Sequence, residues 1–569
     1  MRFKKNRPSH VPHSPNALLA PRLPAGRSAF VMALMFVAFA ALAARACWVQ
    51  IIEHDFHAAQ GEKRHRHTIE LDGRRGSIVD RHGALLAISL TTYEIWADPK
   101  RLERAAYVPL AQTLGLTPAL LQERLASERA LVLLKRQVDA QTADRIAHLS
   151  LAGVTQVASS KRYYPEGESA AHVVGFTDID DSGLEGIELA ADTVLAGEPG
   201  EHDVIRDRLG RIVSDFRPLV PARHGATVQL TIDRRIQQLA FTQLKAALAR
   251  HGAQAGSVVV LDARNGEILA LANAPGFDPN ERAQLHGRAL RNRALTDTFE
   301  PGSTIKPLLI ATALDAGRAQ PASLIDTAPG RYSIGANTIR DTANHGTISV
   351  TQALTKSSNV ALAKLALTLP AQTMWTKYQE YGLGRAPQLP FPGVSPGRLR
   401  PWQRWRPIEQ ATMAYGYGVS ASLMQMAQAY TAFAGDGSLR PATLILSEND
   451  DPGLPTPALR VTTPETAAAL RAMLEATTDD DATGRAARVQ GYRVGGKTGT
   501  AWKHAGTGYA KGKYRALFVG IAPIDAPRLV VAVMIDEPAR AFYGSTVAAP
   551  VFASVAGSAL RLLGVPPDA

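Results

Sequence analysis

The chain has 569 residues, of which 46% are hydrophobic, and it carries a formal net charge of +12. This length and apolar content are enough for two or three domains with buried cores. Half of the charge lies in residues 1–27 and the rest is spread along the chain, so the sequence has no basic, aromatic-interleaved stripe typical of nucleic-acid binding. The single cysteine, Cys47, excludes an intrachain disulfide framework and a cysteine-based zinc site, and the fifteen histidines include no His-x-x-x-His pair. We therefore expect no nucleic-acid partner, no metal site and no cofactor.

A basic tail and an apolar segment open the chain. Residues 28–44 are seventeen consecutive uncharged residues, the lower limit for a helix that crosses a bilayer. Trp48 and the apolar residues after it extend the segment, so we predict a transmembrane signal-anchor helix over 28–50. The tail, residues 1–27, has no acidic residue, which places the N-terminus in the cytoplasm and the rest of the chain across the membrane. Its cations are Arg2, Lys4, Lys5, Arg7, Arg22 and Arg27.

Two other interpretations of this segment are a cleaved signal peptide and a lipoprotein anchor. The apolar stretch is long for a signal peptide, and Ala44-Arg45-Ala46 is a poor cleavage site. A lipid anchor on Cys47 is disfavoured by Arg45 two positions before it. The signal anchor remains the preferred prediction.

Residues 64–220 contain many charges and glycine turns but no nucleophile constellation, so we predict a non-catalytic α+β domain there. The charges of Arg206-Asp207-Arg208 are typical of a solvated or interdomain ion-pair network. The first predicted elements are a strand, a turn and a second strand over 74–87. A helix follows that starts at Pro118 with Thr117 as its N-cap, within a mostly helical stretch over 119–149. The last predicted elements are a strand that ends at 161–163 before Pro165 and a helical piece that starts at 183–188.

From about residue 225 to 569 the pattern changes to apolar strands at both ends with helices between them. Thr231-Ile232-Asp233 precedes a helix that runs through Leu248, and residues 551–563 form a closing apolar helix. We therefore predict a five-stranded antiparallel sheet covered by helices, with the helix after Ser303 running under it. The five predicted strands are 257–261, 268–272, 497–502, 516–522 and 529–535.

Ser303 and Lys306 form the one Ser-x-x-Lys of the chain. The Pro301-Gly302 turn precedes them and the apolar run 305–314 follows, which predicts a buried helix with both side chains in its first turn and on one face. A serine hydroxyl becomes a strong nucleophile when a nearby base takes its proton. A lysine can serve as that base when burial and the helix dipole lower its pKa.

Two further elements follow in the sequence. Lys356-Ser357-Ser358-Asn359 places a hydroxyl and an amide in a loop before the apolar segment 360–367. Lys497-Thr498-Gly499-Thr500 contains the one Lys-Thr-Gly of the chain. The order Ser-x-x-Lys, Ser-x-Asn, Lys-Thr-Gly is the signature of penicillin-binding proteins and class A β-lactamases, with Ser where the middle element often has Asp.

On these motifs the chain resembles class B penicillin-binding proteins, most closely the division-specific FtsI type, over nearly everything after the tail. The resemblance also rests on the segments 75–87, 163–165, 183–188, 299–303 and 415–418. It implies a penicillin-binding transpeptidase fold over 225–569, preceded by the membrane helix and an elongated pedestal or dimerisation-type domain. It also implies that the enzyme lies in the inner membrane with a periplasmic catalytic domain, cross-links peptidoglycan and is acylated by β-lactams.

The resemblance implies that Ser303 attacks the D-Ala-D-Ala carbonyl of a stem peptide to form an acyl-enzyme with release of D-Ala. Lys306 is then the candidate base, although the base is disputed in this superfamily. Ser357 relays a proton to the leaving amine, held by Asn359 and Lys497. An acceptor amine from a second stem peptide resolves the acyl-enzyme into a cross-link.

For substrate binding, the resemblance implies that Lys497 and Thr498 hold the donor carboxylate. Gly499 lets an extended substrate lie against the strand, and the backbone N–H groups of Ser303 and Thr500 form the oxyanion hole.

The sequence leaves open the roles of four features near the three motifs. Glu300 either orients the acceptor amine or caps the helix, and Tyr415 and Tyr417 either line the cleft or pack in the core. Lys356 is compatible with a plain surface charge. The loop 477–485 carries three consecutive aspartates where the family tends towards glycine, which leaves a substrate contact there undecided.

Several related functions share these motifs. A β-lactamase needs a water-activating carboxylate and no large membrane-side domain, and a β-lactam sensor usually needs a cytoplasmic effector larger than a 27-residue tail. A catalytically silent scaffold has no reason to keep the full motif set. An elongation-type class B transpeptidase and a D,D-carboxypeptidase of the same fold remain as alternatives. For the preferred septal transpeptidase, the expected partners are lipid II-derived stem peptides, an FtsW-like glycosyltransferase and other division proteins.

Overall fold

The structure is a computed structural model that describes residues 25–53, 55, 66–71, 73–206, 212–446, 458–505 and 508–569. The chain divides into two compact units. One unit contains the residues up to 71 together with 199–222, and the other contains 72–198 and 223–569. Each unit is described by itself below.

The smaller unit contains the predicted apolar helix. Helix α1 (Ala25–Cys47) continues through a wider turn at Trp48–Ile52, and Gly26–Ile52 is long and apolar enough to cross a membrane. None of its most apolar stretch is buried, whereas the other candidate, Gly544–Leu562, is 56% buried and is a core helix. The same unit holds an antiparallel three-stranded sheet in the order β1-β8-β9, formed by β1 (Arg66–Leu71), β8 (Gly200–Arg206) and β9 (Ile212–Val220). The predicted ion-pair network at residues 206–208 falls on side chains outside the described part of the chain.

The N-terminal part of the larger unit is built on a second sheet. Strand β3 pairs with β2, β4 and β5, and β2 also pairs with β10. Three helices pack their apolar faces together beside this sheet. As predicted, Thr117 caps α4 with its hydroxyl. The elements are β2 (Ile78–Val79), β3 (Leu85–Ala97), β4 (Val132–Val138), β5 (Val154–Tyr163), β10 (Val228–Gln229), α3 (Tyr107–Leu114), α4 (Pro118–Leu125) and α5 (Ala140–His148).

The mostly helical stretch predicted over 119–149 is wrong in its middle. Residues Val132–Val138 form strand β4 between α4 and α5. Pairing with the C-terminal end of β3 decides this segment, because a short apolar run takes the conformation that its tertiary neighbour offers. The helical piece predicted from residue 183 begins three residues later, as α7 (Gly186–Ala190), after the short strand β7 (Gly183–Glu185).

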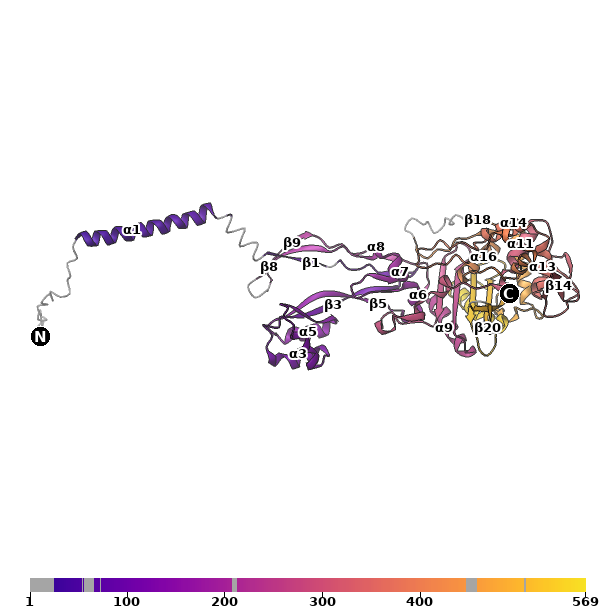
Figure 1. Cartoon of the computed structure of the whole chain (residues 1–569), viewed down its shortest axis with the longest axis horizontal. Coiled ribbons are helices and arrows are strands. Elements are labelled where there is room, and N and C mark those ends of the chain that lie inside the picture. Colours follow the sequence, from indigo (N-terminus) through magenta and orange to yellow (C-terminus); the bar gives the residue numbers. More distant parts are fainter. Residues whose placement is uncertain are drawn as a thin grey trace, which may run out of the picture. The chain divides into compact units, whose positions relative to one another are not determined.

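The predicted five-stranded antiparallel sheet is confirmed, in the order β12-β11-β21-β20-β19. Its two ends come from opposite ends of the domain, which Figure 1 shows as magenta strands beside yellow ones. Strand β19, which carries the Lys-Thr-Gly element, is an edge strand. The strands are β11 (Ala255–Asp262), β12 (Ile268–Ala274), β19 (Gly495–Ala505), β20 (Gly508–Ala522) and β21 (Leu529–Asp536).

Helices cover both faces of this sheet. Helices α9 (Arg234–His251) and α19 (Ala549–Leu562) pack on one face, where Phe518 and Phe552 meet. The other face packs against a helical body that includes α11 (Lys306–Asp315) and α16 (Leu423–Ala434). All residues of β11, β12 and β21 are buried, as expected for strands that are covered on both faces of the sheet.

The remaining helices and strands connect these layers. They are α6 (Ala171–Val174), β6 (Phe176–Thr177), α8 (Asp192–Leu195), α10 (Arg293–Thr296), β13 (Leu324–Asp326), β14 (Arg331–Ile334), β15 (Asn337–Arg340), β16 (Thr347–Ser349), α12 (Val350–Thr355), α13 (Asn359–Leu367), α14 (Ala371–Glu380), α15 (Pro407–Met413), β17 (Ser438–Leu439), β18 (Leu459–Arg460), α17 (Pro464–Glu475) and α18 (Gly544–Val547).

Candidate active site

Ser303 lies in a tight helical turn, Gly302–Ile305, that leads directly into α11, as the sequence predicts. Gly302 has a φ of +53°, a conformation that favours glycine. A β-carbon on Gly302 would lie 3.5 Å from the carbonyl oxygen of Thr500, so this turn lies directly against β19. The first and third sequence elements therefore meet although nearly 200 residues separate them.

The side chains of Ser303, Ser357 and Lys306 form one hydrogen-bonded chain. The hydroxyl of Ser357 donates to Ser303 Oγ at 3.0 Å, and Lys306 Nζ donates to Ser357 Oγ at 3.1 Å. Lys306 Nζ also donates to the Ser357 carbonyl oxygen at 2.5 Å and to Asn359 Oδ1 at 2.8 Å. The ammonium thus has three oxygen partners, and none of them is a carboxylate.

The backbone of Ser357 is in the left-handed region, with φ +58°. A non-glycine residue in this region costs of order 1 kcal/mol and is often found at functional sites. Ser357 lies between α12 and α13, and its conformation brings both its carbonyl oxygen and its hydroxyl within reach of Lys306. This local strain therefore contributes directly to the geometry of the site.

Burial of Lys306 lowers its pKa well below the ordinary value of a lysine, and the nearby charge of Lys497 lowers it further. The carboxylate of Asp341 acts in the opposite direction but is outweighed. Lys497 is also fully buried, and burial lowers its pKa to about 7. Both lysines therefore reach the neutral form far more easily than a surface lysine does.

Lys497 and Thr498 lie at the start of the edge strand β19. Lys497 Nζ donates to the carbonyl oxygen and to the hydroxyl of Thr498 at 3.2 and 3.3 Å. The Thr498 hydroxyl donates to Thr483 Oγ1 at 3.3 Å, and the Thr483 hydroxyl donates to the Thr355 carbonyl oxygen at 3.4 Å. Sequence reasoning did not single out Thr483, because it sits in the loop 477–485, whose aspartates gave the stronger signal.

Gly499 is required by packing. A β-carbon there would come within 2.9 Å of Thr304 Cγ2 and 3.1 Å of Leu517 Cβ. The glycine therefore lets β19 approach the turn that carries Ser303. Thr500, the next residue of β19, accepts a hydrogen bond from the backbone N–H of Gly544 at 3.1 Å.

Asp341 is a further residue of this site that sequence reasoning missed. Its carboxylate accepts hydrogen bonds from the Ser358 hydroxyl at 2.5 Å and from the backbone N–H groups of Asn359 and Val360 at 2.5 and 3.0 Å. It thereby holds the start of α13, and with it the Asn359 side chain that accepts from Lys306. Asp341 belongs to no local pattern, so the sequence carries no signal for this role.

Glu300 connects two segments that flank the nucleophile. One carboxylate oxygen accepts from the backbone N–H of Gly418 and the other accepts from the Tyr509 hydroxyl, both at 2.8 Å. Burial and the Glu300 carboxylate raise the pKa of Tyr509, which keeps this donor protonated. Among the described residues Glu300 makes no hydrogen bond to the start of α11, so the helix-capping alternative is not what the structure contains.

The two tyrosines of the loop 415–418 have different surroundings. Tyr415 packs against the hydrophobic core. Tyr417 is half-buried and its ring makes edge contacts with Tyr415 at 5.8 Å and with Tyr509 at 5.9 Å. Burial raises the pKa of Tyr415 to about 12. Tyr417 thus belongs to an aromatic cluster with Tyr509, the donor to Glu300. Lys356 is exposed, as a plain surface charge would be.

The arrangement combines the groups that acyl transfer needs. A serine hydroxyl is linked through a second hydroxyl to an amine of low pKa, a buried lysine lies nearby, and an open strand edge is available to an extended peptide. No group of three or more acidic, histidine or cysteine side chains in the described residues is placed to hold a metal ion.

Known proteins share this architecture. The model of the penicillin-binding protein transpeptidase domain matches residues 256–557, more than half of the chain, and that of the penicillin-binding protein dimerisation domain matches 70–230. The chain is 41% identical to a probable peptidoglycan D,D-transpeptidase PenA of Neisseria gonorrhoeae over 95% of its own length and 94% of the relative's. It is 36% identical to the peptidoglycan D,D-transpeptidase FtsI of Escherichia coli over 95% and 93% of the two chains.

Solved structures agree with these relatives. The transpeptidase domain of Burkholderia pseudomallei penicillin-binding protein 3 is 45% identical, with a TM-score of 0.55 over 60% of this chain and 98% of that one. Penicillin-binding protein 3 of Mycobacterium tuberculosis, complexed with aztreonam, is 30% identical, with a TM-score of 0.69 over 88% and 98%. The chain described here therefore belongs to the penicillin-binding protein transpeptidase family.

Proposed function

We propose that this protein is a peptidoglycan D,D-transpeptidase of the septal cell wall that works through an acyl-enzyme on Ser303. The observation that carries the proposal is the hydrogen-bonded chain from Ser303 through Ser357 to Lys306, whose pKa burial lowers. The sequence relatives support it, because they are named D,D-transpeptidases and align over nearly the full length of both chains.

In the first step Ser303 Oγ attacks the carbonyl carbon between the two terminal D-Ala residues of a donor stem peptide. Lys306 takes the proton of the Ser303 hydroxyl, and the backbone N–H groups of Ser303 and Thr500 stabilise the oxyanion. The C–N bond then breaks, and the proton reaches the leaving amine through the Ser357 hydroxyl, which lies between Ser303 and Lys306. The products are an ester on Ser303 and free D-Ala.

In the second step an acceptor amine attacks the ester. Its proton returns to Ser303 by way of Lys306, and a new amide cross-links two stem peptides. Glu300 lies three residues before the nucleophile with both oxygens already engaged, so we assign it the positioning of Tyr509 and of the loop 415–418 beside the acceptor.

The remaining candidate residues bind substrate. Lys497 and Thr498 hold the terminal carboxylate of the donor, and the open edge of β19 pairs with the extended peptide past Gly499. Tyr417 lines the entrance near Glu300. A β-lactam enters the same cleft and acylates Ser303, which the aztreonam complex of the Mycobacterium tuberculosis relative supports.

We also propose where in the cell this protein lies and which proteins it works with. Helix α1 anchors the chain once in the inner membrane with a cytoplasmic N-terminus, residues 225–569 work as the periplasmic transpeptidase domain, and residues 64–220 serve as a non-catalytic pedestal domain. The named FtsI relative supports a septal role with an FtsW-like glycosyltransferase and other division proteins as partners.

The test is labelling of the full-length, detergent-solubilised protein with a fluorescent penicillin, followed over hours. We expect a stable adduct on the wild type and none on Ser303→Ala. Rapid loss of the adduct from the wild type would instead indicate a β-lactamase. An unlabelled wild type would overturn the proposal.

A D-Ala release assay with and without an acceptor amine separates the two possible acyl acceptors. A transpeptidase yields the cross-linked product when acceptor is added. Release of D-Ala to water alone, with no cross-linked product at any acceptor concentration, would instead indicate a carboxypeptidase.

A further inference from the structure

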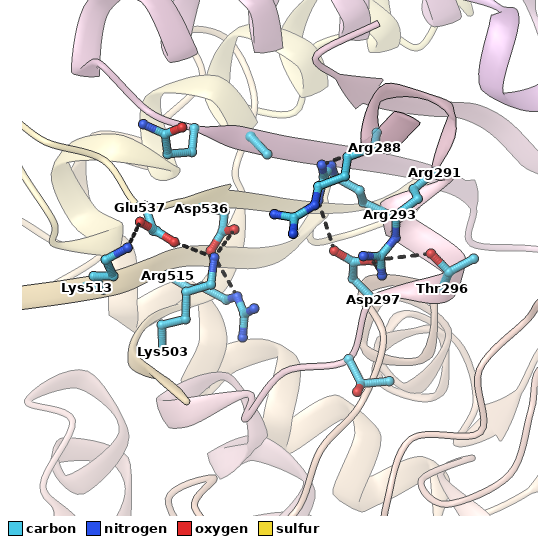
Figure 2. Close-up of a pocket in the computed structure, with 13 residues that line it drawn as sticks. Arg288, Arg291, Arg293, Thr296, Asp297, Lys503, Lys513, Arg515, Asp536 and Glu537 are labelled. Atoms are coloured by element: carbon cyan, nitrogen blue, oxygen red, sulfur yellow. Dashed lines mark hydrogen bonds and ion pairs between the residues drawn. The ribbon is translucent and has the colours of Figure 1, made fainter. Parts of the chain in front are cut away.

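A polar cavity of about 760 Å³ lies beside the active site, between the end of the central sheet and residues 288–298. Figure 2 shows its charged side chains as two groups that face each other across the cavity. Six lining side chains are cationic and three are acidic, so the cavity has an excess of positive charge. The cations are Arg288, Arg291, Arg293, Lys503, Lys513 and Arg515, and the acids are Asp297, Asp536 and Glu537.

The acidic side chains hold the cations in place, but they are too few to neutralise all of them. Asp297 is shared by Arg291 and Arg293. On the opposite wall, Lys503 bridges two acids at 2.7 and 2.6 Å, and each of these acids also meets a second cation. Every carboxylate therefore serves two cations, and positive charge is left over for a ligand.

Two guanidinium groups keep donors available. The side chain of Arg288 makes no hydrogen bond or ion pair within the described residues. Arg515 uses only its Nε, which donates to Asp536 Oδ1 at 3.1 Å, and it lies 5.9 Å over the ring of Phe299. Its two Nη atoms have no partner in the described part of the chain. A guanidinium held in this way presents a planar pair of donors that matches a carboxylate.

The loop that carries Arg288 is held by buried polar groups. His172 Nε2 donates to the Ala289 carbonyl oxygen at 2.7 Å, and Asn292 donates to the His172 carbonyl oxygen at 3.0 Å. Asn273 of β12 donates to Asn292 Oδ1 at 2.9 Å. Burial lowers the pKa of His172 to about 4, so its ring stays neutral and keeps this hydrogen bond at neutral pH. The wall is thus preorganised before any ligand arrives.

The cavity adjoins a second pocket that reaches Glu300. A neighbouring pocket shares Thr298 and Arg515 with it and is also lined by Glu300 and Trp502. Strand β19 runs from Lys497, where the donor carboxylate binds in the proposed function, past Thr500 towards Lys503 at the cavity. An extended peptide along β19 whose reacting carbonyl lies at Thr500 reaches the level of Lys503 about three residues upstream, roughly 10 Å away.

We infer that this cavity binds a free carboxylate of the donor stem peptide, upstream of its D-Ala-D-Ala end, through Arg288 and Arg515. The inference rests on the proposed function, because that function sets the direction of the peptide along β19. It adds the substrate class: donors with an acidic residue whose carboxylate is free are preferred over donors in which that carboxylate is an amide.

The test uses two synthetic pentapeptide donors that end in D-Ala-D-Ala and differ only in whether the upstream carboxyl is free or amidated. The full-length protein is compared with Arg288→Gln and Arg515→Gln, and the kcat/KM for D-Ala release is divided by each protein's own rate of penicillin acylation. We expect the wild type to prefer the free acid by roughly tenfold, the effect of one charge-assisted hydrogen bond. Each substitution should reduce this preference through a higher KM for the acid donor and leave the amide donor unchanged.

Arg318→Gln is the matched control, because Arg318 is an exposed arginine beyond the far end of α11. It should keep the full preference. Equal kcat/KM for the two donors in the wild type, with normal penicillin acylation, would overturn the inference and leave the proposed function intact. Absence of acylation in the wild type would overturn the proposed function itself.

A competition arm distinguishes a carboxylate from a phosphate as the bound anion. If pyrophosphate at low millimolar concentration inhibits turnover of the acid and amide donors equally in the wild type, and no longer does so in Arg288→Gln, the cavity is a phosphate site and the carboxylate assignment is wrong. Inhibition confined to the acid donor supports the assignment.

Discussion

Two clusters of buried charge in the larger unit differ in whether their cations meet a carboxylate. In the N-terminal part, Arg75 and Arg162 both bind the fully buried Glu188, at 2.6 and 2.7 Å. In the cleft, Lys306 and Lys497 are fully buried, but their hydrogen-bond partners are hydroxyl, carbonyl and amide oxygens. Buried cations therefore behave differently according to whether a carboxylate lies beside them.

The pKa values of the buried cations shift in opposite directions in the two clusters. Burial acts to lower the pKa of Arg75, but the Glu188 carboxylate outweighs it and the pKa is raised. Burial lowers the pKa of Lys306 and of Lys497, because no carboxylate offsets the loss of hydration sufficiently. A paired buried cation thus stays charged and depends on its carboxylate partner, whereas an unpaired one becomes available for proton transfer.

The strongest test of this contrast is Lys306→Met. Removing a buried amine that no carboxylate pairs should leave the free energy of unfolding unchanged or higher, because the folded protein no longer has to bury the ammonium. Acylation by penicillin should fall by about 10³-fold or more if the amine is the base. Stopped-flow acylation and thermal unfolding measure the two effects. A variant that acylates within tenfold of the wild type would show that Lys306 is not the base.

The opposite result is expected for Glu188→Gln. This change leaves two buried guanidinium groups without their shared carboxylate and should lower the free energy of unfolding by about 3–5 kcal/mol. The acylation rate per folded molecule should stay the same, because Glu188 lies in the N-terminal part and not in the cleft. Denaturant titration measures the loss.

The matched control for this change is Glu198→Gln. Glu198 pairs with Arg223 at 3.6 Å on the surface, where both side chains are more than 70% exposed. No measurable loss of stability is expected from it. Equal effects of the two glutamate substitutions would contradict the assignment of Glu188 as a buried anchor.

A smaller effect is expected from Asp341→Asn. The carboxamide replaces a carboxylate that accepts three hydrogen bonds at the start of α13, so we expect a loss of about 1–2 kcal/mol in stability. Acylation should slow by roughly tenfold, because Asn359 is held less firmly beside Lys306. Thr117→Ala removes a comparable cap from α4 and serves as the control. It should cost similar stability without slowing acylation, and a slowing as large as that of Asp341→Asn would refute the link to the cleft.

The smallest effect concerns the pH profile of acylation. A base whose pKa is lowered is neutral, and so active, above that pKa, and acylation should fall as the pH drops through it. In Lys497→Met the positive charge that helps to lower the pKa of Lys306 is absent, so this pKa rises. The acidic limb of the acylation rate should therefore move to higher pH. Second-order rates with penicillin between pH 5 and 9 measure the shift, and a move to lower pH would contradict it.

Much of this architecture could be predicted from the chain itself. The alternation of apolar runs and turns located four strands of the central sheet, the Lys-Thr-Gly element located the fifth, and the apolar segment after the basic tail located α1. The order of Ser303, Ser357 and Lys497 along the chain predicted one shared cleft, where the structure places them. These features have local signals, because hydrophobic period and turn residues act over a few positions.

Other features depended on the tertiary structure. Strand β4 took its conformation from β3, and Asp341 reached Ser358 from a segment without any motif. The positive φ of Ser357 and the lowered pKa of Lys306 arise from neighbours that are distant in sequence. The sequence by itself determined which chemical groups are present and in what order. Only folding decided which of them are buried and paired, because hydration and electrostatic energies depend on distances across the whole molecule.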